Sequence, residues 1–134
     1  MKRPFLLTGI SGAMAVGLGA LGAHALKQKM QDGLITPDQL NAFDTAARYQ
    51  MYHTLAIGLV LYIAAQNPSK ALTWSVRMFT AGIVLFSGSL YFLSTRALFN
   101  AEWLKVLGPV TPLGGLCFMA GWICFGLAAL KKVN

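Results

Sequence analysis

The sequence is poor in charged residues, and poorest in acids. Of its 134 residues, 11 are Lys or Arg and only 4 are Asp or Glu, so charged residues make up 11% of the chain, against about 25% in soluble domains. So few charges cannot cover the surface of a water-soluble domain of this size. The hydrophobic fraction of 56% also excludes a disordered chain. The composition therefore predicts a membrane protein.

The sequence also lacks cysteines placed for a disulfide and acids placed for a proton relay in the membrane. Cys117 and Cys124 lie seven residues apart, which in one helix separates their Cα atoms by about 10 Å, too far for a disulfide. We expect both to be small packing residues. The sequence has no Asp or Glu inside a long apolar run, which argues against a proton-driven transporter with a carboxylate relay.

Long uncharged stretches are what the sequence does have. Four of them lack Asp, Glu, Lys and Arg, at residues 4–26, 49–69, 78–95 and 106–130. A helix needs about 20 mostly apolar residues to cross a bilayer. We therefore predict an all-α polytopic membrane protein, a single domain over residues 1–134. Its bundle of four transmembrane helices is expected at about 4–26, 49–65, 78–95 and 111–130.

The longest polar connection, residues 27–48, contains a helix start. Thr36 is a suitable N-cap, Pro37 fits the first helical position, and Gln39 completes the capping pattern. Leu40 and Phe43 then share one face. This pattern predicts a short amphipathic helix between helices 1 and 2, which either lies on the outer membrane surface or runs straight into helix 2.

The charges fall into two groups at opposite helix ends. One group holds six cations and no anion: Lys2, Arg3, Lys70, Arg77, Lys131 and Lys132. The other mixes both signs: Lys27, Lys29, Arg48, Arg96 and Lys105 with Asp32, Asp38, Asp44 and Glu102. Because positive loops stay on the inner side, we expect both termini to be cytoplasmic, in a bacterial inner membrane.

Small residues recur every four positions on the expected helices 1 and 4. Such rows let membrane helices approach closely. Two rows on helix 1 predict that it is packed on more than one side and is central in the bundle. The expected packing residues are Gly9, Ala13 and Gly17 in one row, Ala15, Gly19 and Ala23 in the other, and Gly114 and Gly121 on helix 4.

Polar residues are rare in these segments, and intramembrane polar groups tend to be functional. Counted from the nearest charged residue, His24 lies about 4–5 Å and His53 about 7–8 Å from the same outer side. This similar depth predicts a polar cluster in the outer leaflet, to which all four helices contribute residues. Its candidate members are His24, Tyr49, Gln50, His53, Ser87, Tyr91 and Thr111.

Three interpretations of this cluster stay open. The histidines bond to neighbouring polar groups and tie helices together; the cluster binds a lipid headgroup, a quinone or another small amphiphile; or His24 and His53 ligate a b-type haem. Zinc is disfavoured, because two histidines supply too few ligands.

The sequence contains no constellation of nucleophile, base and orienting group. Neither a phosphate-binding loop nor a basic and aromatic run for nucleic acid is present. We therefore expect a non-enzymatic structural, accessory or lipid-binding subunit, with membrane lipid and a second copy or a complex as partners. A small transporter or channel acting as an oligomer is a further alternative.

Four blocks carry a resemblance to a known family: GALGAHAL at 19–26, FDTAARYQMYH at 43–53, FSGSLY at 86–91 and GPVTPLGG at 108–115, followed by Gly121 and Trp122. In these blocks the chain resembles the membrane family called domain of unknown function 423, whose eukaryotic relatives are named transmembrane protein 256. The resemblance covers nearly the whole chain. It implies a small four-helix protein of the bacterial inner membrane and implies no activity.

Overall fold

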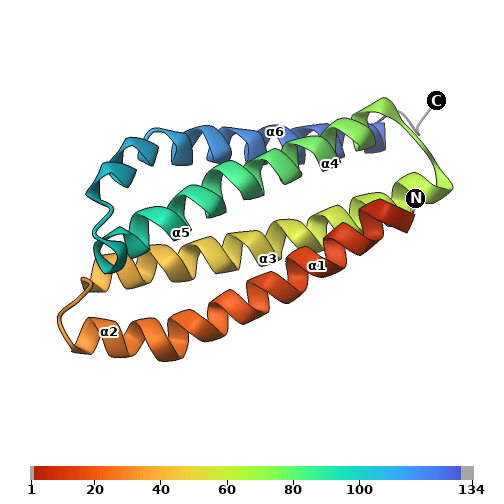
Figure 1. The fold of residues 1–134 in the computed structure, drawn as a ribbon. Helices are drawn as coiled ribbons and strands as arrows, with labels where there is room; N and C mark the ends of the chain where they lie inside the picture. Colours follow the sequence, from red (N-terminus) through yellow and green to blue (C-terminus); the bar gives the residue numbers. More distant parts are fainter. Residues whose placement is uncertain (1, 131–134) are drawn as a thin grey trace.

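The computed structural model describes residues 2–130, and these form four long helical rods joined by short connections (Figure 1). The first rod comprises α1 (Lys2–Leu21), the π-helical turn η1 (Gly22–Leu26) and α2 (Lys27–Gln31). The second is α3 (Pro37–Gln66). The third comprises α4 (Lys70–Gly82), the π-helical turn η2 (Ile83–Ser87) and α5 (Gly88–Thr95). Two 3-10 turns, η3 (Arg96–Phe99) and η4 (Glu102–Leu107), lead to the fourth rod, α6 (Val110–Leu130).

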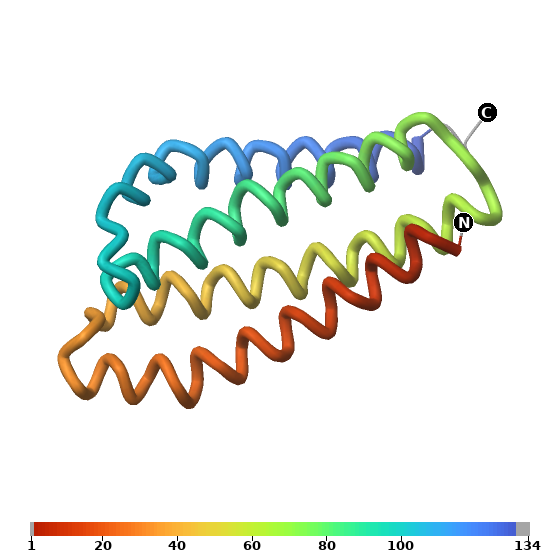
Figure 2. The backbone as a smooth tube through the Cα atoms, viewed as in Figure 1, coloured from red at the N-terminus to blue at the C-terminus, as the bar shows by residue number. Residues whose placement is uncertain are grey.

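The rods run alternately up and down (Figure 2). The start of α1, the α3–α4 connection and the end of α6 lie at one end of the bundle, and the α2–α3 and α5–α6 connections lie at the other. We call these the basic end and the mixed end, after the charges described above. α1 packs mainly on α3, α3 packs on α4 and α5, and α4 packs closely on α6.

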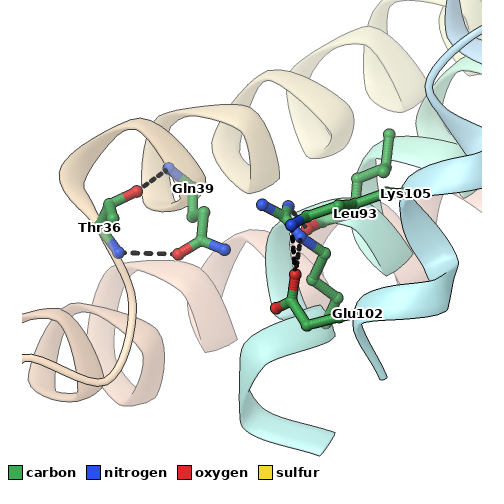
Figure 3. Close-up of polar contacts among 6 residues, drawn as sticks. Thr36, Gln39, Leu93, Glu102 and Lys105 are labelled. Carbon is green, nitrogen blue, oxygen red and sulfur yellow. Dashed lines mark hydrogen bonds and ion pairs between the residues drawn. The ribbon is translucent and has the colours of Figure 1, made fainter. Parts of the chain in front are cut away.

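Of the two alternatives for the amphipathic segment between helices 1 and 2, the structure shows the second: it runs straight into helix 2, and its residues are the first turns of α3. Thr36 caps this helix as predicted. Its hydroxyl accepts a hydrogen bond from the backbone N–H of Gln39 at 3.1 Å, and the side-chain oxygen of Gln39 accepts one from the backbone N–H of Thr36 at 2.8 Å (Figure 3). From there no proline interrupts the chain before Pro68. The buried face that starts at Phe43 and Ala47 continues in helical phase through Gln50, Thr54 and Ile57. It packs on neighbouring helices, so it is not a membrane-surface face.

Within residues 2–130, three segments are long and apolar enough to cross a membrane: Lys2–Gln31, Lys70–Phe99 and Glu102–Leu130. α3 is as long as the first two but is not among them. Its apolar part includes Gln50 and His53, both buried inside the bundle. The all-helical prediction is confirmed, whereas composition supports three of the four expected spans.

The prediction that helix 1 is central is wrong. α1 lies at the edge of the bundle and uses one face, on which Ala15 is buried. The row Gly9, Ala13 and Gly17 is exposed, and a Cβ on Gly9 or Gly17 would meet nothing within 4 Å. Two small-residue rows point in different directions, but α1 has only one close neighbour.

The α4–α6 contact depends on glycines. A Cβ on Gly121 would lie 2.6 Å from the Phe79 ring, and one on Gly82 would lie 2.3 Å from the Phe118 ring. A Cβ on Gly114 would lie 2.3 Å from the backbone nitrogen of Phe86. α6 therefore approaches both α4 and η2 at separations that only glycine permits.

The π-helical turn η2 changes which face of the third rod is buried. In α4 the buried residues follow one another at three or four positions, as Leu72, Ser75, Phe79 and Gly82. The next buried residue, Ser87, comes five positions after Gly82. A wide turn carries about one residue more than an α-helical turn. This extra residue brings Ser87 to the bundle interior.

Candidate functional site

A hydrogen-bonded network around Gln50 joins three helices near the middle of the bundle. The Gln50 amide nitrogen donates to the Ser11 carbonyl at 3.0 Å, and its oxygen accepts from the Tyr91 hydroxyl at 2.7 Å. The Ser11 hydroxyl pairs in turn with the Thr54 hydroxyl at 2.7 Å. Gln50 is only 3% exposed. The network thus connects α1, α3 and α5 through groups that would be costly to leave unpaired in an apolar medium.

His53 lies in a separate, aromatic environment. Its ring stacks on Phe118 with centroids 3.5 Å apart and planes at 7°. Its Nδ1 lies 2.8 Å from the Tyr49 carbonyl oxygen, and the Trp122 indole N–H lies 3.3 Å from its Nε2. A carbonyl only accepts and an indole N–H only donates, so the partners select the neutral tautomer with its proton on Nδ1. His53 thereby ties α3 to α6.

Ser87 and Thr111 make two further ties. The Ser87 hydroxyl donates to the Ala46 carbonyl of α3 at 2.8 Å. The Thr111 hydroxyl pairs with that of Ser89 at 2.6 Å and so joins α6 to α5. Tyr49 is 40% exposed, and its ring packs against Phe86 with centroids 4.9 Å apart. The Ser87 and Thr111 hydroxyls therefore have hydrogen-bond partners inside the protein, whereas Tyr49 contributes ring packing.

His24 lies apart from the other candidates. It is exposed on η1. In the α1–α3 pairing Gly12 faces Thr54 and Gly22 faces Phe43, so His24 lies level with residues 41–42 of α3. Those residues are 11 or 12 positions from His53, about 17 Å along the helix axis. The predicted similar depth is wrong because both helices continue beyond the expected ends, to Gln31 and from Pro37.

This distance bears on the haem interpretation. Two axial histidines must approach one iron from opposite sides. An exposed His24 and a buried His53 separated by about 17 Å along the bundle do not form such a pair. The side chains of this chain therefore do not fit a bis-histidine haem at this place.

A crevice runs along the bundle between the first and third rods. It consists of two adjoining hollows of about 390 Å³ and 420 Å³ that share Ile83 and Val84 of η2. Its floor is α3, through Thr54 and Ile57 in one hollow and Gln50 in the other. Its α1 wall extends from Pro4 to Leu18, about 21 Å along the helix. The walls are mainly apolar, and the Gln50 network lies at their base.

The mixed end is held by one ion pair between η3 and η4 and a second within η4. The Glu102 carboxylate lies 2.8 Å from Lys105 Nζ and 3.5 Å from Arg96 Nε (Figure 3). The Arg96 guanidinium also donates to the Leu93 carbonyl. These contacts fix the connection between α5 and α6. They also account for two of the five cations at this end.

Comparison with known proteins assigns the family. The model of the family described as "Protein of unknown function (DUF423)" matches residues 18–115. The chain belongs to this family. It is 39% identical over 131 residues to the UPF0382 membrane protein SAB0533 of Staphylococcus aureus and 39% identical over 132 residues to the UPF0382 membrane protein YwdK of Bacillus subtilis. Each alignment covers 98% of both chains. No solved structure matches this DUF423 chain.

The resemblance inferred from the four sequence blocks is confirmed by this match. All four blocks, GALGAHAL, FDTAARYQMYH, FSGSLY and GPVTPLGG, lie wholly inside the matched range. Those blocks supply Gln50, His53, Ser87 and Tyr91, which make the interhelical ties.

Sequence reasoning missed several partners of these ties. Thr54 lies four residues after Gln50 and so shares its helix face, which was an available signal. Phe118 and Trp122 are likewise four residues apart on α6. Their pairing with His53 depends on how α6 packs against α3. No sequence pattern within one helix reveals that relation.

Proposed function

We propose that this DUF423 chain is a non-enzymatic membrane protein that crosses the bilayer four times and holds a lipid chain in the crevice between α1 and the α4–α5 rod. The observation that carries the proposal is the crevice itself, a mainly apolar hollow about 21 Å long on the side of the bundle. In a membrane such a hollow faces hydrocarbon. One leaflet of hydrocarbon is about 15 Å thick. A lipid chain that spans one leaflet is therefore shorter than the crevice and fits within it.

Four spans are supported by the arrangement of α3. The other three rods are apolar enough to span, and α3 lies antiparallel to its neighbours with similar length. Its polar side chains Gln50 and His53 are buried and hydrogen-bonded, which is how polar groups are accommodated in membrane helices. The related proteins of Staphylococcus aureus and Bacillus subtilis are named membrane proteins.

The orientation follows from the charges. Lys2, Arg3 and Lys70 lie at the basic end, and all four acids of the sequence lie towards the mixed end. By the positive-inside rule, the basic end and both termini are cytoplasmic, in a bacterial inner membrane.

A non-enzymatic role is supported by what the polar side chains do. Gln50, Tyr91 and Ser11 hydrogen-bond to one another or to the backbone, and His53 is held between Tyr49 and Trp122. These groups act as ties between helices, the first of the three interpretations left open by the sequence. The apolar crevice then remains as the surface for a ligand.

The test is native mass spectrometry of protein released from a mild detergent. Val84 lies in the crevice and is 64% exposed, whereas Val16 on α1 is 62% exposed and does not line it. We expect the wild type and Val16→Trp to retain the same number of lipid molecules and Val84→Trp to retain one fewer. A bare wild-type chain, or equal retention by both variants, contradicts the proposal.

A further inference from the structure

A second cavity lies at the basic end, away from the crevice. It has a volume of about 490 Å³ and is formed where α3 ends, α4 begins and α6 ends. Its apolar wall includes Ile63, Leu72 and Phe125, and its polar rim includes Asn67 and Ser69. None of the residues that line it lines the crevice. The cavity therefore combines a hydrocarbon-sized interior with a polar opening.

The surroundings of this opening carry one sign of charge. Lys70 follows directly after the rim residue Ser69 and is exposed. Lys2 and Arg3 begin the first rod at the same end of the bundle (Figure 1). The acids nearest in sequence to the other connections, Asp32, Asp38 and Glu102, belong to the mixed end. The end of the bundle that holds the cavity thus carries a field that attracts anions.

An exposed tryptophan marks the depth at which the cavity lies. Trp74, one turn into α4, is 51% exposed, and the Arg77 guanidinium lies 5.3 Å from its ring centroid. Lys70, Trp74 and Arg77 follow one another at helical spacing and share one face of α4. Exposed tryptophan flanked by cations is typical of the headgroup level of a bilayer. At that level the cavity adjoins lipid phosphates.

We propose that this cavity is a binding site for an anionic phospholipid, which places one acyl chain against Ile63, Leu72 and Phe125 and its phosphate beside Lys70. The inference rests on the proposed membrane topology but not on the crevice. The apolar interior selects a chain-bearing molecule, and the excess of cations selects a negative headgroup over a zwitterionic one.

The experiment measures how much of each lipid the detergent-solubilised full chain retains from an equimolar mixture of phosphatidylglycerol and phosphatidylcholine, again by native mass spectrometry. We expect the wild type to prefer phosphatidylglycerol. Lys70→Gln should lower this preference about fivefold, the factor that corresponds to about 1 kcal/mol for one Lys near an anionic surface. The matched control Lys29→Gln, an exposed position at the mixed end, should leave it unchanged.

A second pair of variants tests the role of the cavity independently of the charge of Lys70. Ala129 lines the cavity and Leu127 does not. We expect Ala129→Trp to abolish preferential retention and Leu127→Trp to preserve it. We also expect inorganic phosphate to leave the lipid in place, because it has no chain for the apolar wall.

Three results would overturn the proposal: equal retention of the two lipids by the wild type, equal effects of Lys70→Gln and Lys29→Gln, or an unchanged preference in Ala129→Trp. Failure of the crevice proposal has a different signature. In that case Val84→Trp retains as much lipid as the wild type, while the preference for phosphatidylglycerol and its dependence on Lys70 persist.

Discussion

The Tyr91 hydroxyl donates a 2.7 Å hydrogen bond to the side-chain oxygen of Gln50, and this contact joins α5 to α3 across 41 positions of sequence. The same Gln50 reaches α1 through the Ser11 carbonyl. One side chain therefore holds the edge helix and the third rod at a fixed relative height. This is also the base of the crevice between them, so its shape depends on the Gln50 contacts.

Replacing Tyr91 by Phe removes only the hydroxyl. Gln50 then loses one of its partners, and we expect the free energy of unfolding to fall by about 0.5–1.5 kcal/mol. Dodecyl sulfate titration in mixed micelles measures this change. Tyr62→Phe serves as the control, because Tyr62 is 62% exposed. An equal loss in both variants would mean that the Gln50 contact contributes nothing specific.

Gly114→Ala should be strongly destabilising for its size. The added Cβ would meet the Phe86 backbone at 2.3 Å, and backbone cannot move aside as a side-chain tip can. We expect a loss of about 1–3 kcal/mol in the same titration. Gly9→Ala, where a Cβ meets nothing within 4 Å, should be neutral or slightly stabilising. Similar behaviour of the two variants would contradict the close α6–η2 contact.

The two histidines should differ sharply on truncation. His53→Ala removes the stack on Phe118 and leaves the Trp122 indole N–H without its partner. We expect a loss of about 2–5 kcal/mol, the range for large-to-small changes in a packed interior. His24→Ala, at an exposed position, should stay within about 0.5 kcal/mol. A large effect at His24 would mean that it has a partner outside the chain.

Reporter fusions test the orientation. Green fluorescent protein fused after Asn134 should fluoresce, because the C-terminus is expected in the cytoplasm. Alkaline phosphatase inserted after Gly33, in the turn between α2 and α3, should be active, because that turn belongs to the mixed end. Activity of phosphatase at the C-terminus would reverse the orientation and contradict the assignment from charge.

The helical class and the approximate places of the helices could be predicted from the sequence, because uncharged runs and helix caps are local signals. The Thr36 cap is an example: its partners are within three residues. What the sequence could not supply was the place where each rod ends. Charged residues such as Lys27 and Arg48 predict helix boundaries, yet both lie within helical segments. The depths expected for His24 and His53 are wrong for the same reason, because they are counted from these charged residues.

The site was predicted less well, since it depends on relations between helices. Choosing Gln50 and Tyr91 as cluster members needed only the rarity of polar groups in apolar segments. Grouping His24 with them needed the α1–α3 register, which the small-residue rows do not determine. The pairing of His53 with Phe118 depends on how α6 packs against α3, which no single-helix pattern contains.

The wide turn η2 divides the third rod into two parts, α4 and α5, and the face that each part buries is set separately. An α-helix rotates by about 100° per residue, so gaining or losing one residue within 83–87 would swing Ser89 and Tyr91 around the bundle while Ser75 and Phe79 stayed on α6. Such a one-residue change would turn a different face of α5 toward the bundle interior. The glycine contacts between α4 and α6 in the basic half would stay as they are. The turn thus sets the orientation of one half of the third rod independently of the other half.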